Sequence, residues 1–233
     1  IIFLSKYEDY LKSAKKIKDN SNLKVNINYV EDFILKENKI EILKNSIIYF
    51  LCNSELNKKL VELLRNTNCY IFNKKFFESN YTKLEMQELL INNNINTPQV
   101  YQISNKDQMK LPILFKENKH AGMIFEAYTK NTIAEFFKKF KEENFYVEEK
   151  INDGYEVKYY YVKGNIYAKG DSIIEKTVKL YCEKISNVLG LEVFSVDMIK
   201  KDRQYIVIDI NPSAGFYLLD EARNKLINEI ERI

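Results

Sequence analysis

The chain has 233 residues, of which 45% are hydrophobic and 30% are charged, a composition typical of soluble globular proteins. The formal net charge is +3 and basic residues are interspersed with acidic ones, so we expect no nucleic-acid partner. No apolar run reaches membrane-spanning length, no signal peptide is visible, and the three cysteines lack paired spacing, so we expect a cytoplasmic protein with reduced thiols and no membrane segment.

The first eighty residues alternate strand-like and helical stretches. One helix is marked by an apolar stripe of Leu56, Leu60, Leu63 and Leu64, with Ser54 at its start. Apolar runs predict strands at 1–5, 23–30, 46–52 and 69–73. Because strands that alternate with helices usually form parallel sheets covered by those helices, we expect a small α/β domain here.

A helix opens the next segment. Thr82 and Glu85 have the spacing of a capping box, which predicts a helix that begins there and runs to about Asn92. Pro98 then opens an extended stretch. Further strands are predicted at 113–117, 123–128 and 145–151, and a helix between the last two has the apolar residues Ile133, Phe136, Phe137 and Phe140.

The last part of the chain contains two predicted hairpins and two helices. Strands at 155–163 and 165–169 are joined through Lys163-Gly164-Asn165. A helix over 172–189 presents Ile174, Val178, Tyr181, Ile185 and Val188, and a closing helix presents Leu219, Ala222, Leu226 and Ile230. We therefore predict three α/β pieces in series, at 1–80, 81–150 and 151–233.

The second hairpin, 193–211, carries polar side chains inside apolar strands. Asp209 and Asn211 are two residues apart, so both leave the same face of their strand. Asp197 lies across from Asp209 if the hairpin turns through an odd number of residues. A carboxylate in an apolar strand is costly unless its charge is compensated, and three oxygen ligands suit Mg²⁺ completed by substrate phosphates. The hairpin therefore predicts a metal–phosphate site; the alternative is a hairpin with stray polar residues.

Lysine and glutamate residues in two other strands suggest a nucleotide site. Lys116 stands in an otherwise apolar strand, and its compact ammonium suits phosphate oxygens. Alternatively, its charged end reaches water from the end of the strand. Glu148 and Glu149 end the strand at 145–151, where a backbone edge could bind adenine, although exposed acidic pairs are common.

Alternation in the strand at 155–163 places Glu156 and Lys158 on the face opposite to its tyrosines. The two charged side chains either form a surface pair or line a polar cleft. His120 is the only histidine, and neither a hydrolase triad nor a zinc ligand set accompanies it, so we expect it to be non-catalytic.

Taken in order, these elements resemble the ATP-grasp superfamily, in particular the ribosomal-protein glutamate ligase and glutathione synthetase type. The resemblance covers residues 70–216 and rests on an ordered set of segments rather than on any one of them. These are Tyr70-Ile-Phe-Asn73, Thr82-Lys83 and Ile95-Asn-Thr-Pro98 (the family's "N…DK…LL…GI..P" run), Phe115-Lys116 (its strand lysine), Val147–Ile151 (its hinge strand), Glu156-Val-Lys158 (its acidic-x-Arg pair), and Val196-Asp197 with Ile208-Asp-Ile-Asn-Pro212 (its metal-binding strands).

The resemblance implies an α/β fold with α+β subdomains, namely an ATP-grasp fold with an N-terminal Rossmann-like pre-ATP-grasp domain. It implies an ATP-dependent carboxylate–amine ligase that phosphorylates a carboxylate of an amino acid, peptide or related metabolite and lets an amine displace the phosphate. By the resemblance, Lys83 and Lys116 contact the ATP phosphates, and Glu156 binds the ribose. The adenine end is held by Glu148, Glu149, Lys150 and Ile151. The metal, Mg²⁺ or Mn²⁺, is bound by Asp197, Asp209 and Asn211, and catalysis is assigned to Lys158 and Lys116.

Departures from the family pattern leave alternatives open. Position 158 is Lys where the family favours Arg, which removes a bidentate contact to an acyl phosphate. The segments 118–122 and 169–172 are short for the family, and the chain starts at Ile1, so we expect that the sequence lacks residues at these places; otherwise the enzyme is trimmed. An ATP-binding scaffold without turnover, a ligase with a thiol or hydroxyl acceptor, and a homo-oligomer all remain open.

Overall fold

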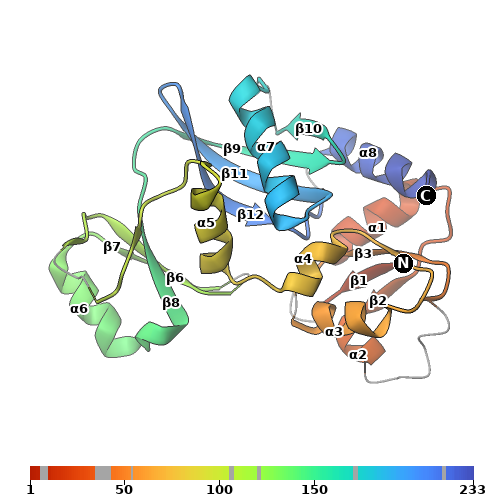
Figure 1. Cartoon of the computed structure of the whole chain (residues 1–233), viewed down its shortest axis with the longest axis horizontal. Coiled ribbons are helices and arrows are strands. Elements are labelled where there is room, and N and C mark those ends of the chain that lie inside the picture. Colours follow the sequence, from red (N-terminus) through yellow and green to blue (C-terminus); the bar gives the residue numbers. More distant parts are fainter. Residues whose placement is uncertain are drawn as a thin grey trace. The chain divides into compact units, whose positions relative to one another are not determined.

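A computed structural model describes residues 1–5, 10–34, 43–53, 55–104, 108–119, 122–169, 173–216 and 219–233. The chain forms two compact units, and Figure 1 shows their helices and strands. Unit 1 comprises 1–81, 157–197 and 209–233, and unit 2 comprises 82–156 and 198–208. The described strands form three four-stranded sheets, which agrees with the predicted α/β class. The division into three domains remains a prediction.

The N-terminal part of unit 1 is a parallel sheet with the strand order β2-β1-β3-β4. Its strands are β1 (Ile2–Leu4), β2 (Ile27–Tyr29), β3 (Ile47–Phe50) and β4 (Tyr70–Ile71), and its helices are α1 (Leu11–Asn20), α2 (Val30–Ile34), α3 (Glu55–Leu63) and α4 (Lys74–Ser79). The predicted strands are present but shorter, since only 27–29 of the stretch 23–30 pairs with β1. In α3, Leu60 and the following Leu64 are buried, whereas Leu63 is exposed, and Ser54 lies outside the described residues.

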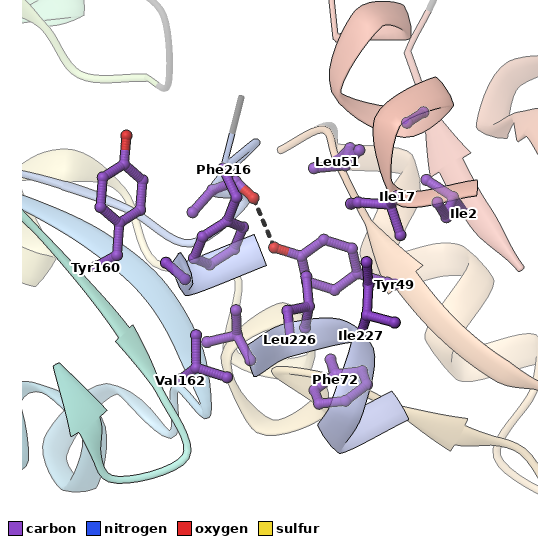
Figure 2. Close-up of a cluster of buried hydrophobic side chains, with 14 of the residues drawn as sticks. Ile2, Ile17, Tyr49, Leu51, Phe72, Tyr160, Val162, Phe216, Leu226 and Ile227 are labelled. Carbon is purple, nitrogen blue, oxygen red and sulfur yellow. Dashed lines mark hydrogen bonds between the residues drawn. The ribbon is translucent and has the colours of Figure 1, made fainter. Parts of the chain in front are cut away.

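A single hydrophobic cluster joins distant parts of the sequence within unit 1. Figure 2 shows Tyr49 of β3 and Ile17 of α1 in the same cluster as Phe216 and Leu226 from the end of the chain. The hydroxyl of Tyr49 donates a 2.7 Å hydrogen bond to the carbonyl of Ala214, and both groups are buried. The segment that follows the predicted metal strand is therefore fixed against the N-terminal sheet.

The C-terminal sheet has the strand order β10-β9-β11-β12. Its strands are β9 (Tyr155–Val162), β10 (Asn165–Ala168), β11 (Val193–Lys201) and β12 (Gln204–Asn211), and the helices are α7 (Lys176–Leu189) and α8 (Asp220–Glu231). Lys163 and Gly164 both have positive φ, 43° and 86°, as a two-residue type I′ hairpin turn requires, and Val162 pairs with Asn165.

The predicted apolar face of α7 needs a correction. The buried residues of the helix are Val178, Cys182, Ile185 and Leu189. Tyr181 and Val188 are only half-buried, and Ile174 precedes the helix. Both sets have helical spacing, so periodicity alone could not choose between two adjacent stripes.

Unit 2 contains an antiparallel sheet with the strand order β5-β8-β6-β7. Its elements are β5 (Val100–Tyr101), β6 (Ile113–Glu117), β7 (Ile124–Ala127), β8 (Phe145–Glu149), α5 (Lys83–Asn92), α6 (Lys130–Lys139) and a 3₁₀ turn at Glu142–Asn144. The predicted capping box of Thr82 and Glu85 is confirmed at the start of α5. Phe136 of α6 stacks on Phe115 of β6 with ring centroids 3.8 Å apart, so the phenylalanines of α6 pack the helix against the sheet. Figure 1 shows α6 beside the strands of this sheet.

None of the helices in the described part of the chain has both the length and the apolar character that crossing a membrane requires.

Candidate active site

The strand lysine of unit 2 forms a buried ion pair. Lys116 on β6 lies opposite Tyr146 of β8, so Glu148, two residues further along β8, shares its face. The ammonium of Lys116 pairs with the Glu148 carboxylate and donates to the carbonyl of Ile208 at 3.2 Å. The two charged side chains are only 14% and 2% exposed. Lys116 is therefore held inside unit 2 by a counter-charge rather than extended into water.

The end of β8 is also occupied by contacts within unit 2. The backbone N–H of Glu149 donates to the Gln99 carbonyl at 2.8 Å, and that of Lys150 donates to the Pro112 carbonyl at 3.0 Å. These two N–H groups already have acceptors, so an adenine contact from this strand must use other groups. Ile151 follows the strand and is half-buried.

The ammonium of Lys150 forms a surface cluster with β7. It donates to the carboxylate of Glu126 and to the hydroxyl of Tyr128, and it lies 4.7 Å from the centre of the Tyr128 ring. Hydrogen bonds from Lys150 and then Tyr128 lower the pKa of Glu126, and the reciprocal bond to Glu126 raises the pKa of Lys150. The ammonium of Lys150 is therefore already paired with the carboxylate of Glu126.

The two remaining nucleotide candidates stand at the beginnings of elements. Lys83 is the first residue of α5 and is half-buried, and Glu156 is exposed near the start of β9. The Asn118 side chain accepts a 2.8 Å hydrogen bond from the N–H of Leu84, which ties the residues after Lys116 to the first turn of α5. His120 and parts of the segments 118–122 and 169–172 lie outside the described residues, so the predictions about them stay predictions.

In unit 1, Lys158 forms an ion pair with Asp197, one of the predicted metal ligands. The ammonium of Lys158 on β9 lies 2.8 Å and 2.7 Å from the two carboxylate oxygens of Asp197 on β11. The side chains are 29% and 16% exposed. Burial and then the Asp197 charge raise the pKa of the neighbouring Tyr160. Lys158 thus compensates the strand carboxylate that the sequence marked as costly.

The other two metal candidates stand at the end of β12. Asp209 is exposed, and Asn211 is half-buried with its side-chain oxygen accepting the N–H of Ser213 at 2.9 Å. Two residues, Asp202 and Arg203, separate the ends of β11 and β12, and Asp202 has a φ of 55°. Convergence of the three side chains stays a prediction.

The donor atoms of these three residues fit Mg²⁺. Two carboxylates and one amide oxygen are hard ligands, and a magnesium site commonly takes one or two carboxylates with waters and substrate phosphates. No group of three or more His, Cys, Asp or Glu side chains within the described ranges is arranged to hold a metal ion, and the predicted trio contains only two residues of these types. The fit therefore depends on the amide of Asn211 and on oxygen atoms from a substrate.

Sequence reasoning included Asn73 in the family resemblance but assigned it no role, and the structure shows that it connects these strands to the N-terminal sheet. Asn73 follows β4, is 1% exposed, and bonds through its side chain to Glu192, Val193 and Pro212. The available signal was an Asn directly after a buried strand and before a helix, where a left-handed backbone suits Asn, and its φ is 56°. No local pattern could have shown which distant strands it contacts.

No protein-family model and no curated protein matches the sequence of this chain. Solved structures, however, match nearly its whole length. The ATP-grasp ligase PsnB, complexed with precursor peptide PsnA2 and AMPPNP, has a TM-score of 0.72 at 12% identity, with 99% of this chain and 95% of PsnB covered. D-alanine–D-alanine ligase from Bacillus anthracis has a TM-score of 0.74 at 14% identity, with coverage of 99% and 95%.

A third solved structure is the macrocyclase MdnC from Microcystis aeruginosa MRC, bound with precursor peptide MdnA. Its TM-score is 0.72 at 12% identity, and the match covers 100% of this chain and 99% of MdnC. The chain therefore has the ATP-grasp fold, which confirms the resemblance found in the sequence at the level of fold. At these identities the fold is shown and the chemistry has to be argued from the site.

Proposed function

We propose that the chain is an ATP-dependent carboxylate–amine ligase that forms an amide bond through an acyl phosphate. The observation that carries the proposal is the Lys158–Asp197 contact at 2.7–2.8 Å in a chain with the ATP-grasp fold. An ammonium suited to a phosphoryl oxygen and a carboxylate suited to Mg²⁺ are thereby held next to each other within unit 1.

The assignment of the residues follows the chemistry of phosphoryl transfer, which depends on positioning and on neutralising charge rather than on a protein nucleophile. Lys83 and Lys116 bind ATP phosphates, Glu148, Glu149, Lys150 and Ile151 surround the adenine, and Glu156 binds the ribose. Asp197, Asp209 and Asn211 would hold Mg²⁺, which supplies charge neutralisation at the phosphates when bound. Lys158 exchanges its Asp197 partner for the phosphoryl group of the acyl phosphate.

The substrate class is proposed from the matched structures. PsnB and MdnC are described with bound precursor peptides, and D-alanine–D-alanine ligase is named for an amino-acid substrate. We therefore propose a peptide or amino-acid carboxylate as the group that is phosphorylated, and an amine as the acceptor.

The test is a screen for ADP formation in the presence of Mg²⁺ and ATP, with amino acids, dipeptides and longer peptides offered singly and in pairs. The ligase predicts ADP release that depends on both a carboxylate and an amine, with a new amide detected by mass spectrometry. Thiols and alcohols are included as acceptors, and ADP release with these alone would replace the amine by another nucleophile.

A second candidate function is an ATP-binding scaffold without turnover. The observation that favours it is that both proposed phosphate-binding lysines of the strands already have acidic partners, Lys116 with Glu148 and Lys158 with Asp197. Tight ATP binding without ADP release for any acceptor would establish the scaffold and exclude the ligase.

A further inference from the structure

Asn73 makes a full set of hydrogen bonds to the ends of two strands. Its side-chain oxygen accepts from the N–H groups of Glu192 and Val193 at 2.7 Å and 3.0 Å. Its side-chain nitrogen donates to the carbonyls of Val193 and Pro212 at 2.6 Å and 2.8 Å. A carboxamide offers two acceptor positions and two hydrogens, so all four are used.

The two strands that Asn73 joins are those that carry the proposed metal ligands. Val193 is the first residue of β11, which holds Asp197, and Pro212 directly follows Asn211, the last residue of β12. One buried side chain therefore fixes the beginning of one ligand strand and the end of the other. All of these residues belong to unit 1.

The residues after Pro212 extend the same connection. The N–H of Ser213 donates to the side-chain oxygen of Asn211 at 2.9 Å, and the Ser213 hydroxyl donates to the buried carbonyl of Cys52 at 2.7 Å. The bond from Ser213 orients the amide of Asn211, in the way that groups outside a metal's ligand set orient its ligands. The Pro212 carbonyl and the Ser213 N–H belong to one planar peptide group, so Asn73, by binding this carbonyl, fixes the N–H that orients Asn211.

We propose that Asn73 is a positioning residue for the metal: it sets the ligand geometry of Asp197 and Asn211 through the backbone of Val193 and Pro212. The proposal rests on the magnesium site of the proposed function. It goes beyond a role in packing because it predicts that loss of the amide weakens cation binding in a protein that is still folded.

Two substitutions test the proposal without disturbing the left-handed backbone of residue 73. Asn73→Asp keeps the size and tolerates a positive φ, but it removes the two donors. Asn73→Gly also accepts the positive φ and removes the whole amide. The aspartate adds a negative charge that by itself would attract a cation, so weaker cation binding in that variant has to come from lost geometry.

A matched control is Thr67→Val, between α3 and β4. The Thr67 hydroxyl donates to the Leu64 carbonyl at 2.7 Å and does not touch β11 or β12 among its described contacts. The isosteric loss of this donor reports the effect of destabilising the N-terminal sheet alone.

The probe is Mn²⁺, measured as the free ion by electron paramagnetic resonance in the presence of a non-hydrolysable ATP analogue. The analogue without protein is the reference, because its triphosphate also binds Mn²⁺, and folding is checked by circular dichroism. We expect at least tenfold weaker Mn²⁺ binding in both Asn73 variants and unchanged binding in Thr67→Val, in line with losses on removing such supporting groups. Wild-type affinity in folded Asn73 variants would overturn the inference alone. Absence of Mn²⁺ binding by the wild-type protein with nucleotide would overturn the magnesium site and the inference together.

Discussion

Replacing Lys116 tests both the buried ion pair of unit 2 and the proposed phosphate contact. Lys116→Met keeps an unbranched side chain in β6 but removes the ammonium that pairs with Glu148, which is 1% exposed. Breaking a buried pair by removing one partner costs about 3–5 kcal/mol, because the remaining charge loses this favourable interaction. We therefore expect the free energy of unfolding to fall by an amount in this range.

A double-mutant cycle separates the ion pair from the rest of the lysine. Glu148→Gln removes the carboxylate charge, so the double variant Lys116→Met/Glu148→Gln contains neither charge of the pair. We expect it to be more stable than the sum of the single losses predicts, with a coupling of about 2–3 kcal/mol. Urea unfolding followed by far-UV circular dichroism measures this, because the chain has no tryptophan for fluorescence. Additive effects would refute the buried pair.

Nucleotide affinity, unlike stability, is expected to depend only on whether Lys116 is present in the wild type, the two single variants and the double variant. Loss of a charge-assisted phosphate contact costs about 1.5–3 kcal/mol, or about 10- to 150-fold in affinity. Calorimetry with a non-hydrolysable ATP analogue should show this loss in both proteins that lack Lys116, including the double variant whose stability is partly restored. If affinity instead recovers together with stability, Lys116 acts only through the fold and the phosphate assignment is wrong.

Three further predictions concern the metal site, the buried thiol and the turns. Asp209→Asn should leave the circular dichroism spectrum unchanged, because the side chain is exposed and the substitution is nearly isosteric. It should nevertheless abolish ADP formation, because the metal loses an anionic ligand. Retained turnover would contradict the metal assignment. Burial raises the pKa of Cys182 from 9.0 to about 12, so the thiol of the unfolded chain ionises at lower pH than that of the folded protein. Above pH 9.0 the free energy of unfolding should therefore fall by about 1.4 kcal/mol per pH unit from this group. Cys182→Ala should remove that part of the slope in alkaline urea titrations, and an unchanged slope would refute the prediction. Gly154→Ala should lower the melting temperature more than Gly164→Ala. Both glycines have positive φ, but a Cβ at position 154 would lie 2.5 Å from the Lys200 carbonyl oxygen, whereas a Cβ at position 164 meets nothing within 4 Å. Equal losses would show that backbone strain alone determines the loss of stability.

Local signals in the sequence were sufficient for most elements of the fold. The capping box of Thr82 and Glu85 is made by residues three apart, and the structure forms it where the spacing predicted. The strand at 113–117 is confirmed to the residue because its apolar run is bounded by a proline and polar residues. Patterns of this kind fix where an element begins, since the atoms that decide it are close in the chain.

Partners that are distant in the sequence could not be predicted in this way. Asn73 bonds to Val193 and Pro212, which are 120 and 139 residues away, and an isolated Asn after a strand carries no sign of either. The prediction of the buried face of α7 failed for a related reason, because tertiary packing, not helical spacing, decides which of two neighbouring apolar rows is buried. The pairing of Lys158 with Asp197 was open for the same reason, although both residues had been singled out.

The ion pairs, one in each unit, change how ligand binding under the proposed function should be understood. Lys116 was chosen as a phosphate ligand and Asp197 as a metal ligand because a charge in an apolar strand needs compensation, whereas Lys158 was assigned to catalysis by the family resemblance. In the structure the protein provides that compensation itself, through Glu148 for Lys116 and through the contact of Lys158 with Asp197. Binding of magnesium and ATP under the proposed function is therefore an exchange of partners, in which Asp197 gives up an ammonium and Lys158 gives up a carboxylate. Because each charge is satisfied before and after, the net affinity is smaller than the sum of the new contacts, and the exchange ties release of Lys158 to occupation of the metal site.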